Sequence, residues 1–347
     1  MPAFRRSPNM KELQIPEIVD LASAFYGSAA LFAALDAGVF AAIEKAGGET
    51  ADLPALAAAT GSSERGLRLL LDACVALGLL AKNPATGAWR NTQAGRLALV
   101  PGAPADLSRA IAYNRDVYPA WGRLGSFVRS GAPVERPELH LGDDDARTRT
   151  FAASMRGRAM AIGRGVVPML DLAGRTRLLD LAGGPGAYAE LLVRANPGLS
   201  AVTVDLPAIS DAAAEFVAQD GLADRIECRH GDYHADEYEP GAYDACTIFG
   251  ALHQESPEDI VAILGRAFRA LKPGGALFVL DMMTDATRAN PPFSALFGLN
   301  MALTTKNGWV FSDDELKGWM REAGFKPGDT RPAPPPMPHW LVSAVRP

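Results

Sequence analysis

The sequence predicts an α/β protein in which a doubly wound, mostly parallel sheet follows a mostly helical N-terminal domain. Two observations predict the sheet. From residue 175 onward, short apolar runs alternate with amphipathic helical patterns, which is typical of a parallel sheet covered on both faces. The run 178–181 leads into Gly183, Gly184 and Gly186 and then a helical pattern, so a tight turn joins a strand to a helix. A third observation, helical spacing through residues 15–100, predicts the N-terminal domain.

Length and composition limit the classes of protein that fit. The 347 residues are enough for two domains, and the net charge of -6 argues against a nucleic-acid-binding surface. The three cysteines lack metal-binding spacing, which indicates unpaired thiols in a reducing compartment. The first residues contain no apolar signal segment, and the uncharged run 21–35 is shorter than the roughly 18–20 residues that span a bilayer. We therefore expect a cytoplasmic protein with no membrane partner.

Residues 1–100 have the layout of a winged helix. Helical patterns cover 15–35, 53–61 and the segment after Ser62, and a turn-rich stretch at 83–92 follows as the wing. DNA binding needs a basic face, but this segment contains nine basic and nine acidic residues. Its first helical region is apolar on more than one face, which favours burial against a second subunit. We expect a dimerisation domain rather than a DNA-binding regulator.

Residues 101–170 link the two halves through helical patterns at 105–129 and 146–169. The first pattern contains Tyr113 and Trp121, and the second contains Met155 and Met160. Two interpretations remain open. These side chains either pack between the domains or form a cap over an apolar substrate pocket, because methionine and aromatic side chains adapt to flat apolar ligands.

Residues 171–347 contain the predicted sheet. Strands are predicted at 177–181, 200–205, 225–229, 243–249 and 275–282. Helices are predicted at 187–196, 208–219, 257–271 and 312–323. In the proline-rich tail from residue 327, only 339–345 has the pattern of a strand.

The glycine turn alone does not identify a ligand. The stretch Gly184-Pro-Gly186-Ala-Tyr-Ala189 fits the G-x-G-x-x-G/A dinucleotide fingerprint, and Asp205 ends the second strand where it could bind ribose hydroxyls. A nicotinamide-dependent oxidoreductase therefore remains possible. Asp232 follows the third strand and His253 follows the fourth, so further polar groups are expected at the same edge of the sheet.

In combination, the segments LLDLAGGPG, VTVDLP, GDYH, LH and LKPGG resemble the class I S-adenosylmethionine-dependent methyltransferases. More narrowly, the chain from about residue 15 onward is similar to small-molecule O-methyltransferases of the caffeic-acid and hydroxyindole type. The resemblance implies a Rossmann-like catalytic domain over 171–347, an N-terminal winged-helix dimerisation domain over 1–100, and linking helices with a substrate cap over 101–170. It also implies S-adenosyl-L-methionine as cofactor, a homodimer, and methyl transfer to a hydroxyl of an aromatic or polyketide-like molecule.

The resemblance also implies roles for individual residues. The turn would wrap the methionine part of the cofactor, Asp205 would bind the ribose with Leu206 beside the adenine, and Asp232 with Tyr233 would hold the adenine. The implied cofactor site comprises Ala182, Gly183, Gly184, Gly186, Asp205, Leu206, Asp232, Tyr233, Phe249 and Gly250. The family usually has glycine at position 182. The implied acceptor pocket comprises Tyr113, Trp121, Met155, Met160, Asn300 and Thr304.

His253 matches the family's catalytic base, and Asp281 matches an acid that orients it. Two departures from the family pattern accompany them. Val310 stands where a second acid is expected, and Gln254-Glu255 replaces the usual Asp-Trp. A carbon or nitrogen acceptor, or a non-methylating enzyme on the same scaffold, therefore remains open.

His230 and His234 have the i, i+4 spacing of metal ligands on a helix. Gly231 and Asp232 between them lie at a predicted strand end, however, where this spacing does not bring the two rings together. We therefore expect no metal site.

Overall fold

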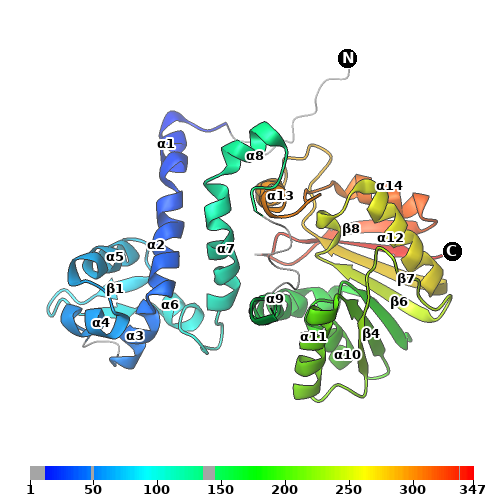
Figure 1. Cartoon of the computed structure of the whole chain (residues 1–347), viewed down its shortest axis with the longest axis horizontal. Helices are drawn as coiled ribbons and strands as arrows, with labels where there is room; N and C mark the ends of the chain where they lie inside the picture. The colour runs from blue at the N-terminus through cyan, green and yellow to red at the C-terminus, as the bar shows by residue number, and fades with distance from the viewer. Residues whose placement is uncertain (1–11, 48–50, 136–144, 336) are drawn as a thin grey trace. The chain divides into compact units, whose positions relative to one another are not determined.

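The computed structural model describes residues 12–47, 51–135, 145–335 and 337–347. The chain forms two compact units, Met1–Arg115 and Asp116–Pro347 (Figure 1). The division into three domains predicted from the sequence remains a prediction.

The first unit consists of helices and a two-stranded wing. Its helices are α1 (Ile15–Ser23), α2 (Phe25–Asp36), α3 (Val39–Lys45), α4 (Leu53–Thr60), α5 (Glu64–Ala76), α6 (Gln93–Ala98) and the first part of α7 (Ser108–Trp121). The wing pairs β1 (Leu80–Lys82) with β2 (Trp89–Asn91) in an antiparallel ladder. Ser63 caps α5 by accepting a hydrogen bond from the amide of Gly66.

Helices α1 and α2 expose much of their apolar surface. The large apolar side chains that lie more than half exposed on them are Ile15, Ile18, Val19, Leu21, Phe25 and Tyr26. The stretch Ile15–Asp36 is long and apolar enough to cross a membrane by length and composition, and 6% of its most apolar window is buried. The expectation that this region is too short to span a bilayer was wrong, because the helical stretch continues through Asp20 to Ile15.

The second unit is built on a seven-stranded sheet in the order β5-β4-β3-β6-β7-β9-β8. Its strands are β3 (Arg177–Leu181), β4 (Ser200–Asp205), β5 (Ile226–His230), β6 (Tyr243–Phe249), β7 (Leu271–Asp281), β8 (Lys326–Pro332) and β9 (Trp340–Val345). The first five are parallel, and β9 pairs antiparallel with both β7 and β8. Since β3 lies between β4 and β6, the order in which successive strands are added to the sheet reverses there, and ligands bind such sheets in the crevice at the carboxyl ends of these strands.

Helices cover both faces of this sheet (Figure 1). The helices of this unit after α7 are α8 (Leu124–Ser130), α9 (Asp145–Val166), α10 (Ala187–Ala195), α11 (Pro207–Gln219), α12 (Pro257–Ala270), α13 (Pro292–Thr304) and α14 (Asp313–Glu322), with short η2 (Val167–Met169) and η3 (Leu252–Gln254). Alternate strand residues face two different cores: Leu179 packs in the core of α12 and α14, and Leu178 in the core of α9, α10 and α11.

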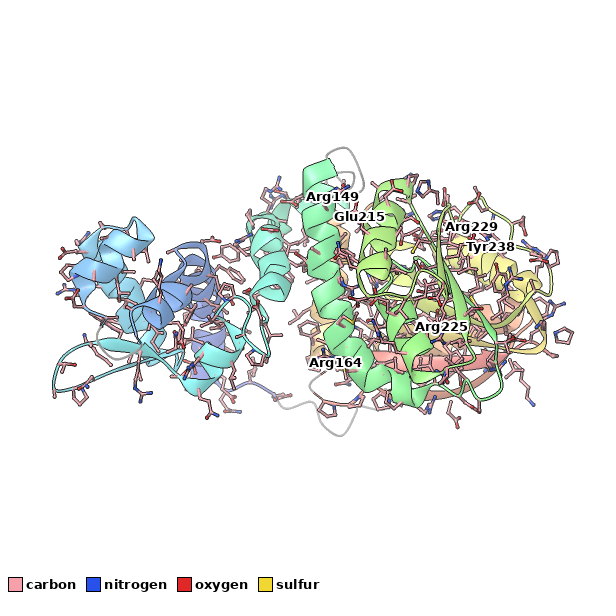
Figure 2. The ribbon with its side chains drawn as sticks, turned by 90° about the horizontal axis from the view of Figure 1, so that it is seen from below. Arg149, Arg164, Glu215, Arg225, Arg229 and Tyr238 are labelled. Atoms are coloured by element: carbon pink, nitrogen blue, oxygen red, sulfur yellow. The ribbon has the colours of Figure 1, made fainter. Side chains whose placement is uncertain are left out.

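Ion pairs and hydrogen bonds join the covering helices to one another. Arg149 of α9 pairs with Glu215 of α11 at 2.8 Å, and both side chains lie at one end of these helices in Figure 2. Arg225 donates to the carbonyl oxygens of Val193, Asn196 and Leu199, which lie at and beyond the end of α10. The Arg149–Glu215 pair thus joins α9 to α11, and Arg225 joins the segment before β5 to the end of α10 and the loop that follows it.

The structure corrects several predicted elements. The predicted helical region 105–129 is broken between α7 and α8, and β7 begins at Leu271 rather than at residue 275, with an irregularity in its pairing to β6 before Ala276. Helix α13 was not predicted, because it is apolar on nearly every face and shows no single stripe. Strand β8 was missed because of its prolines, which are tolerated there because β8 is an edge strand.

Candidate cofactor and active site

The turn from β3 to α10 is shaped by glycines. A Cβ on Gly183 would lie 1.8 Å from Thr203 Oγ1 and 2.6 Å from Asp180 Oδ2, so no side chain fits there. Gly184 and Gly186 have φ of 55° and 76°, the left-handed region that glycine adopts without strain. The turn therefore packs tightly on β4 and presents backbone N–H groups at the start of α10.

Ala182 also adopts the left-handed region, with φ of 53°. For a residue with a Cβ this conformation costs roughly 1–2 kcal/mol. Its methyl group packs against the core that contains Leu181 and Ile248. The departure from the family's glycine therefore introduces backbone strain while the side chain occupies the core side of the turn.

Asp180 lies beneath the turn and is 1% exposed. Its Oδ1 accepts a hydrogen bond of 2.6 Å from Thr247 Oγ1 on the neighbouring strand β6. Burial raises the pKa of Asp180 to about 7, against the lowering effect of the Thr247 hydrogen bond. This carboxyl group thus ties β3 to β6 directly below the crevice.

Asp205, at the end of β4, holds the turn from the side. Its Oδ2 accepts from the Gly184 amide and its Oδ1 from the Leu206 amide, both at 2.8 Å. Burial raises the pKa of Asp205, and these two amide hydrogen bonds oppose the rise. Each carboxylate oxygen has a second lone pair, so Asp205 can also accept hydrogen bonds from ligand hydroxyls.

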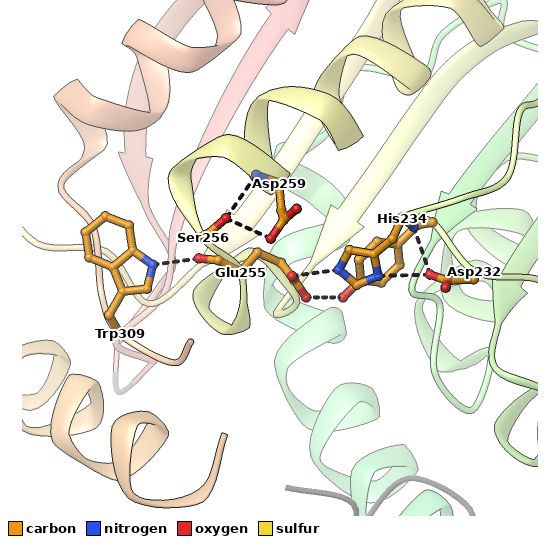
Figure 3. Close-up of polar contacts among 7 residues, drawn as sticks. Asp232, His234, Glu255, Ser256, Asp259 and Trp309 are labelled. Carbon is orange, nitrogen blue, oxygen red and sulfur yellow. Dashed lines mark hydrogen bonds and ion pairs between the residues drawn. The ribbon is translucent and has the colours of Figure 1, made fainter. Parts of the chain in front are cut away.

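A hydrogen-bonded network connects the loop after β5 to the segment after β6 (Figure 3). Asp232 Oδ1 accepts from the amide of His234 and lies 2.9 Å from its Nδ1. Glu255 Oε2 lies 2.7 Å from His234 Nε2, and Glu255 Oε1 accepts from the Tyr233 hydroxyl at 2.7 Å. Trp309 Nε1 donates to the Glu255 carbonyl oxygen at 2.8 Å. Glu255, one of the departures from the family pattern, is therefore the hub of this network.

His253 and Asp281 form a buried pair at the ends of β6 and β7. His253 Nδ1 lies 2.6 Å from Asp281 Oδ1, and the His253 amide donates to Asp281 Oδ2 at 3.3 Å. The Met282 amide also donates to Oδ1. An ionised carboxylate only accepts hydrogen bonds, so a neutral His253 ring carries its proton on Nδ1 and has a lone pair on Nε2. This is the tautomer that a general base requires.

Helix α13 places further predicted residues next to this pair. Phe297 packs edge-on against the His253 ring, with centroids 5.1 Å apart. Asn300 and Thr304 follow at positions i+3 and i+7, on the same face of the helix. Asn300 Oδ1 accepts a hydrogen bond of 2.8 Å from Trp121 Nε1, and Thr304 donates to the Asn300 carbonyl oxygen.

The remaining predicted residues are more dispersed. Phe249 is buried at the end of β6 and packs edge-on against Tyr188, and Gly250 follows it with φ of 66°. Met155 and Met160 are half-buried on α9. Tyr113 lies on the part of α7 that belongs to the first unit.

Comparisons with known proteins identify the family. A family model described as "O-methyltransferase domain" matches residues 136–326, and one described as "O-methyltransferase dimerisation domain" matches residues 19–101. The chain belongs to the O-methyltransferase family.

Curated relatives of this O-methyltransferase cover most of the chain. It is 32% identical over 88% of both chains to a 3-hydroxy-5-methyl-1-naphthoate 3-O-methyltransferase of Streptomyces sahachiroi. It is 31% identical to a tetracenomycin polyketide synthesis 8-O-methyl transferase of Streptomyces glaucescens, over 89% of this chain and 91% of the relative.

Solved structures agree with this assignment. Human N-acetylserotonin methyltransferase in complex with S-adenosylmethionine matches 98% of this chain and 99% of its own, with a TM-score of 0.84 and 25% identity. An O-methyltransferase family protein of Burkholderia thailandensis matches 97% of this chain and 99% of its own, with a TM-score of 0.83 and 28% identity. The predicted fold class is confirmed, and the protein is an S-adenosylmethionine-dependent O-methyltransferase. The nicotinamide alternative is thereby set aside.

Sequence reasoning missed several residues near the pair of His253 and Asp281. His339, next to β9, is 7% exposed, and burial lowers its pKa to about 4, with further effects from Arg158, Asp281 and His253. Its neighbour Trp340 pairs with Asp281 across the β7–β9 ladder, which explains this proximity. Antiparallel pairing between distant strands leaves no signal in the local pattern, so neither His339 nor Arg158 could be selected.

The two histidines with metal-like spacing have other partners. His230 Nε2 lies 2.7 Å from Asp211, and His234 takes part in the network around Glu255. Within the described part of the chain, no cluster of three or more potential metal ligands is present.

Proposed function

We propose that this O-methyltransferase methylates a hydroxyl group of an aromatic, polyketide-like small molecule, with His253 as the general base. The observation that supports this most directly is the hydrogen bond of 2.6 Å between His253 Nδ1 and buried Asp281. It fixes the ring and leaves Nε2 with a lone pair that can accept a proton. The acceptor class follows that of the relatives, which act on a naphthoate, a tetracenomycin intermediate and acetylserotonin.

S-adenosylmethionine, held by the glycine turn and Asp205, would supply an electrophilic methyl group to the acceptor oxygen, and the electron pair of the carbon–sulfur bond would stay on sulfur. His253 Nε2 takes the hydroxyl proton, and Asp281 stabilises the resulting imidazolium. Because a phenol near pKa 10 is much less acidic than an imidazolium near 6.5, His253 accepts the proton as the methyl group is transferred.

The cofactor is assigned to the crevice around the glycine turn. Gly183 lets the turn pack against the sheet, and a Cβ on Gly184 would meet no atom within 4 Å, so the methionine part can approach the backbone there closely. Asp205 retains lone pairs for the ribose hydroxyls, and Asp232 Oδ2 is available to accept from the adenine amino group. Tyr233 and Phe249 provide apolar surface beside the base.

We further propose that Trp121, Asn300 and Thr304 line the acceptor pocket, together with Phe297. The support is the face of α13, which carries Phe297 against His253 and bonds Asn300 to Trp121. Tyr113, Met155 and Met160 remain candidates for the same pocket.

The protein is also proposed to form a homodimer through its N-terminal domain and to act in the cytoplasm. The matched dimerisation domain and the exposed apolar face of α1 and α2 support the dimer. In a dimer, this face would be buried against the partner subunit rather than lie in a membrane.

Two measurements on one preparation test the proposal. Calorimetry with S-adenosylhomocysteine should show one site per chain, and 2-naphthol or 3-hydroxy-2-naphthoate should gain a methyl group on oxygen in the presence of S-adenosylmethionine. Binding without transfer to either phenol would contradict the proposed acceptor class, and no binding at millimolar ligand would contradict the cofactor site.

A further inference from the structure

Glu255 joins the two loops that carry the proposed adenine contacts and the proposed base. Residues 231–236 follow β5 and include Asp232 and Tyr233, and Glu255 lies two positions after His253. The two Glu255 carboxylate oxygens bond to Tyr233 and His234, one to each (Figure 3). The same residue is therefore next to the base in sequence and bonded to the adenine loop in space.

The geometry around His234 fixes its protonation state. Its Nδ1 lies 2.9 Å from Asp232 Oδ1 and its Nε2 lies 2.7 Å from Glu255 Oε2. A neutral imidazole has one N–H group and could donate to only one of these carboxylates. The other ring nitrogen would then place a lone pair against carboxylate oxygen. Both contacts together require the imidazolium form.

Glu255 is 6% exposed, so its partners are energetically important. A buried carboxylate that loses a hydrogen-bond partner is left with a poorly compensated charge. Glu255 therefore depends on His234 and Tyr233 to compensate its charge.

The network extends to the catalytic segment through Trp309. Its Nε1 donates to the Glu255 carbonyl oxygen at 2.8 Å, and its amide donates to the His253 carbonyl oxygen at 3.0 Å. Trp309 thereby holds both ends of the segment 253–255. A change in the position of Glu255 would be transmitted to the residue that carries the base.

The charges facing His234 come from two loops. Asp232 lies on its own loop and Glu255 on the segment after η3. Arg266 of α12 acts electrostatically on Asp232, and Asp236 accepts the Asp232 amide. Burial lowers the pKa of His234, but hydrogen bonds with Glu255 and Asp232 outweigh it and raise the pKa above its ordinary value.

We propose that Glu255 and His234 are positioning residues for the cofactor, and that their ion pair holds Asp232 and Tyr233 where they bind the adenosyl group. The inference rests on the proposed adenine contacts. The ion pair is complete below the ordinary histidine pKa of about 6.5 and is lost as pH rises through the raised pKa of His234. Cofactor affinity should therefore fall with rising pH.

Calorimetry with S-adenosylhomocysteine between pH 6 and 8.5 tests this on the full chain. For the wild type, the dissociation constant should rise about tenfold over this range, since one pKa unit of coupling corresponds to a factor of ten. Glu255→Gln and His234→Gln should bind more weakly at pH 6 and vary less than threefold with pH. His230→Gln, on an exposed histidine at the end of β5, is the matched control and should retain the wild-type profile.

Protonation of S-adenosylhomocysteine itself affects its binding to every variant equally. This effect therefore cancels when the pH profiles of the dissociation constants are compared. In parallel, NMR titration of the His234 ring should give a raised pKa in the wild type and a lower one in Glu255→Gln. Wild-type affinity that is independent of pH, or the wild-type profile in Glu255→Gln, would overturn the inference. Either outcome leaves cofactor binding intact, whereas a complete lack of binding would contradict the proposed function instead.

Discussion

At the scale of single residues, His253 and Asp281 form the pair to which we assign the proposed acid–base chemistry. Both lie at the carboxyl ends of neighbouring strands, β6 and β7, and both are almost fully buried. The Asp281 carboxylate accepts hydrogen bonds from the His253 ring, the His253 amide and the Met282 amide. Asp281 thus fixes the ring tautomer as well as its position.

Replacing Asp281 with asparagine should therefore impair catalysis more than binding. Asp281→Asn presents an N–H to the ring and favours the wrong tautomer, so kcat should fall about 10²- to 10⁴-fold. The affinity for S-adenosylhomocysteine should change less than twofold. Steady-state kinetics and calorimetry measure both quantities, with exposed Asp329→Asn as the control. Retention of wild-type kcat in Asp281→Asn would show that the pair does not orient the base.

Ala182 provides a second test at this scale, because its left-handed backbone is strained. Ala182→Gly should raise the free energy of unfolding by about 0.5–1 kcal/mol, since relief of roughly 1–2 kcal/mol of strain exceeds the entropic cost of glycine. Gly183→Ala should lower the same quantity by about 3 kcal/mol, because its Cβ would overlap Thr203. Urea denaturation measures the free energy of unfolding of both variants. A lower value for Ala182→Gly than for the wild type would contradict the claim that the backbone at Ala182 is strained.

Residue-level prediction from sequence worked where motifs are local. The glycine turn, Asp205, Asp232 and His253 follow strand ends, so their common edge of the sheet could be inferred from alternation alone. The partners of Glu255 could not be inferred, because the hydrogen bonds to Tyr233 and His234 join loops 21–22 residues apart. His339 could not be selected either, because the pairing of β9 with β7 that brings it near Asp281 joins segments distant in the sequence.

At the scale of elements, the starts of three neighbouring strands are tied together by one carboxylate. Asp244, near the start of β6, accepts from the amide and hydroxyl of Thr176 and from the amide of Arg177 at the start of β3. Lys272 of β7 donates to its other oxygen at 2.7 Å. Although burial raises the pKa of Asp244, these hydrogen bonds, led by that from Lys272, lower it well below its ordinary value.

The contribution of Asp244 to the free energy of unfolding should therefore depend on pH. Its folded-state pKa is depressed, so its stabilisation is present above about pH 4, the ordinary aspartate value, and is lost as pH falls toward the folded-state pKa. Asp244→Asn should lower the free energy of unfolding by about 2 kcal/mol at pH 7 and by less at pH 3. Urea denaturation at both values measures this, with exposed Asp224→Asn as the control. An equal difference at pH 7 and pH 3 would refute it.

The elements themselves were predicted well where apolar periodicity was clear. The strands β3, β4 and β6 and the helices α10, α11, α12 and α14 lie within a residue or so of their predicted limits. The prediction did not succeed for α13 and β8. Helix α13 is apolar nearly all round and β8 is rich in proline and charge, so neither shows the pattern that a half-buried element usually has.

At the scale of the whole molecule, the exposed apolar face of α1 and α2 is the feature that a single chain does not account for. Val19 and Phe25 are 64% and 52% exposed on this face. Large exposed apolar patches mark interaction sites, and the matched dimerisation domain spans this region. The proposed dimer therefore accounts for both observations.

The double variant Val19→Glu with Phe25→Glu should abolish the dimer, because it would bury unpaired charges in the interface. Sedimentation should give twice the chain mass of 36.7 kDa for the wild type and the single-chain mass for the variant. Val345→Glu, on a partly exposed residue of β9, should remain dimeric. A wild type that sediments as a monomer, or that pellets with lipid vesicles, would contradict this interpretation of the helices.

The most direct test of the account is methyl transfer by the wild type and by His253→Ala, measured with S-adenosyl[methyl-³H]methionine and 2-naphthol or 3-hydroxy-2-naphthoate. The wild type should place the label on the phenolic oxygen. His253→Ala should lower turnover about 10²- to 10⁴-fold while it binds S-adenosylhomocysteine with unchanged affinity. Label on carbon, or wild-type turnover in His253→Ala, would contradict the role of His253 as the base for O-methylation.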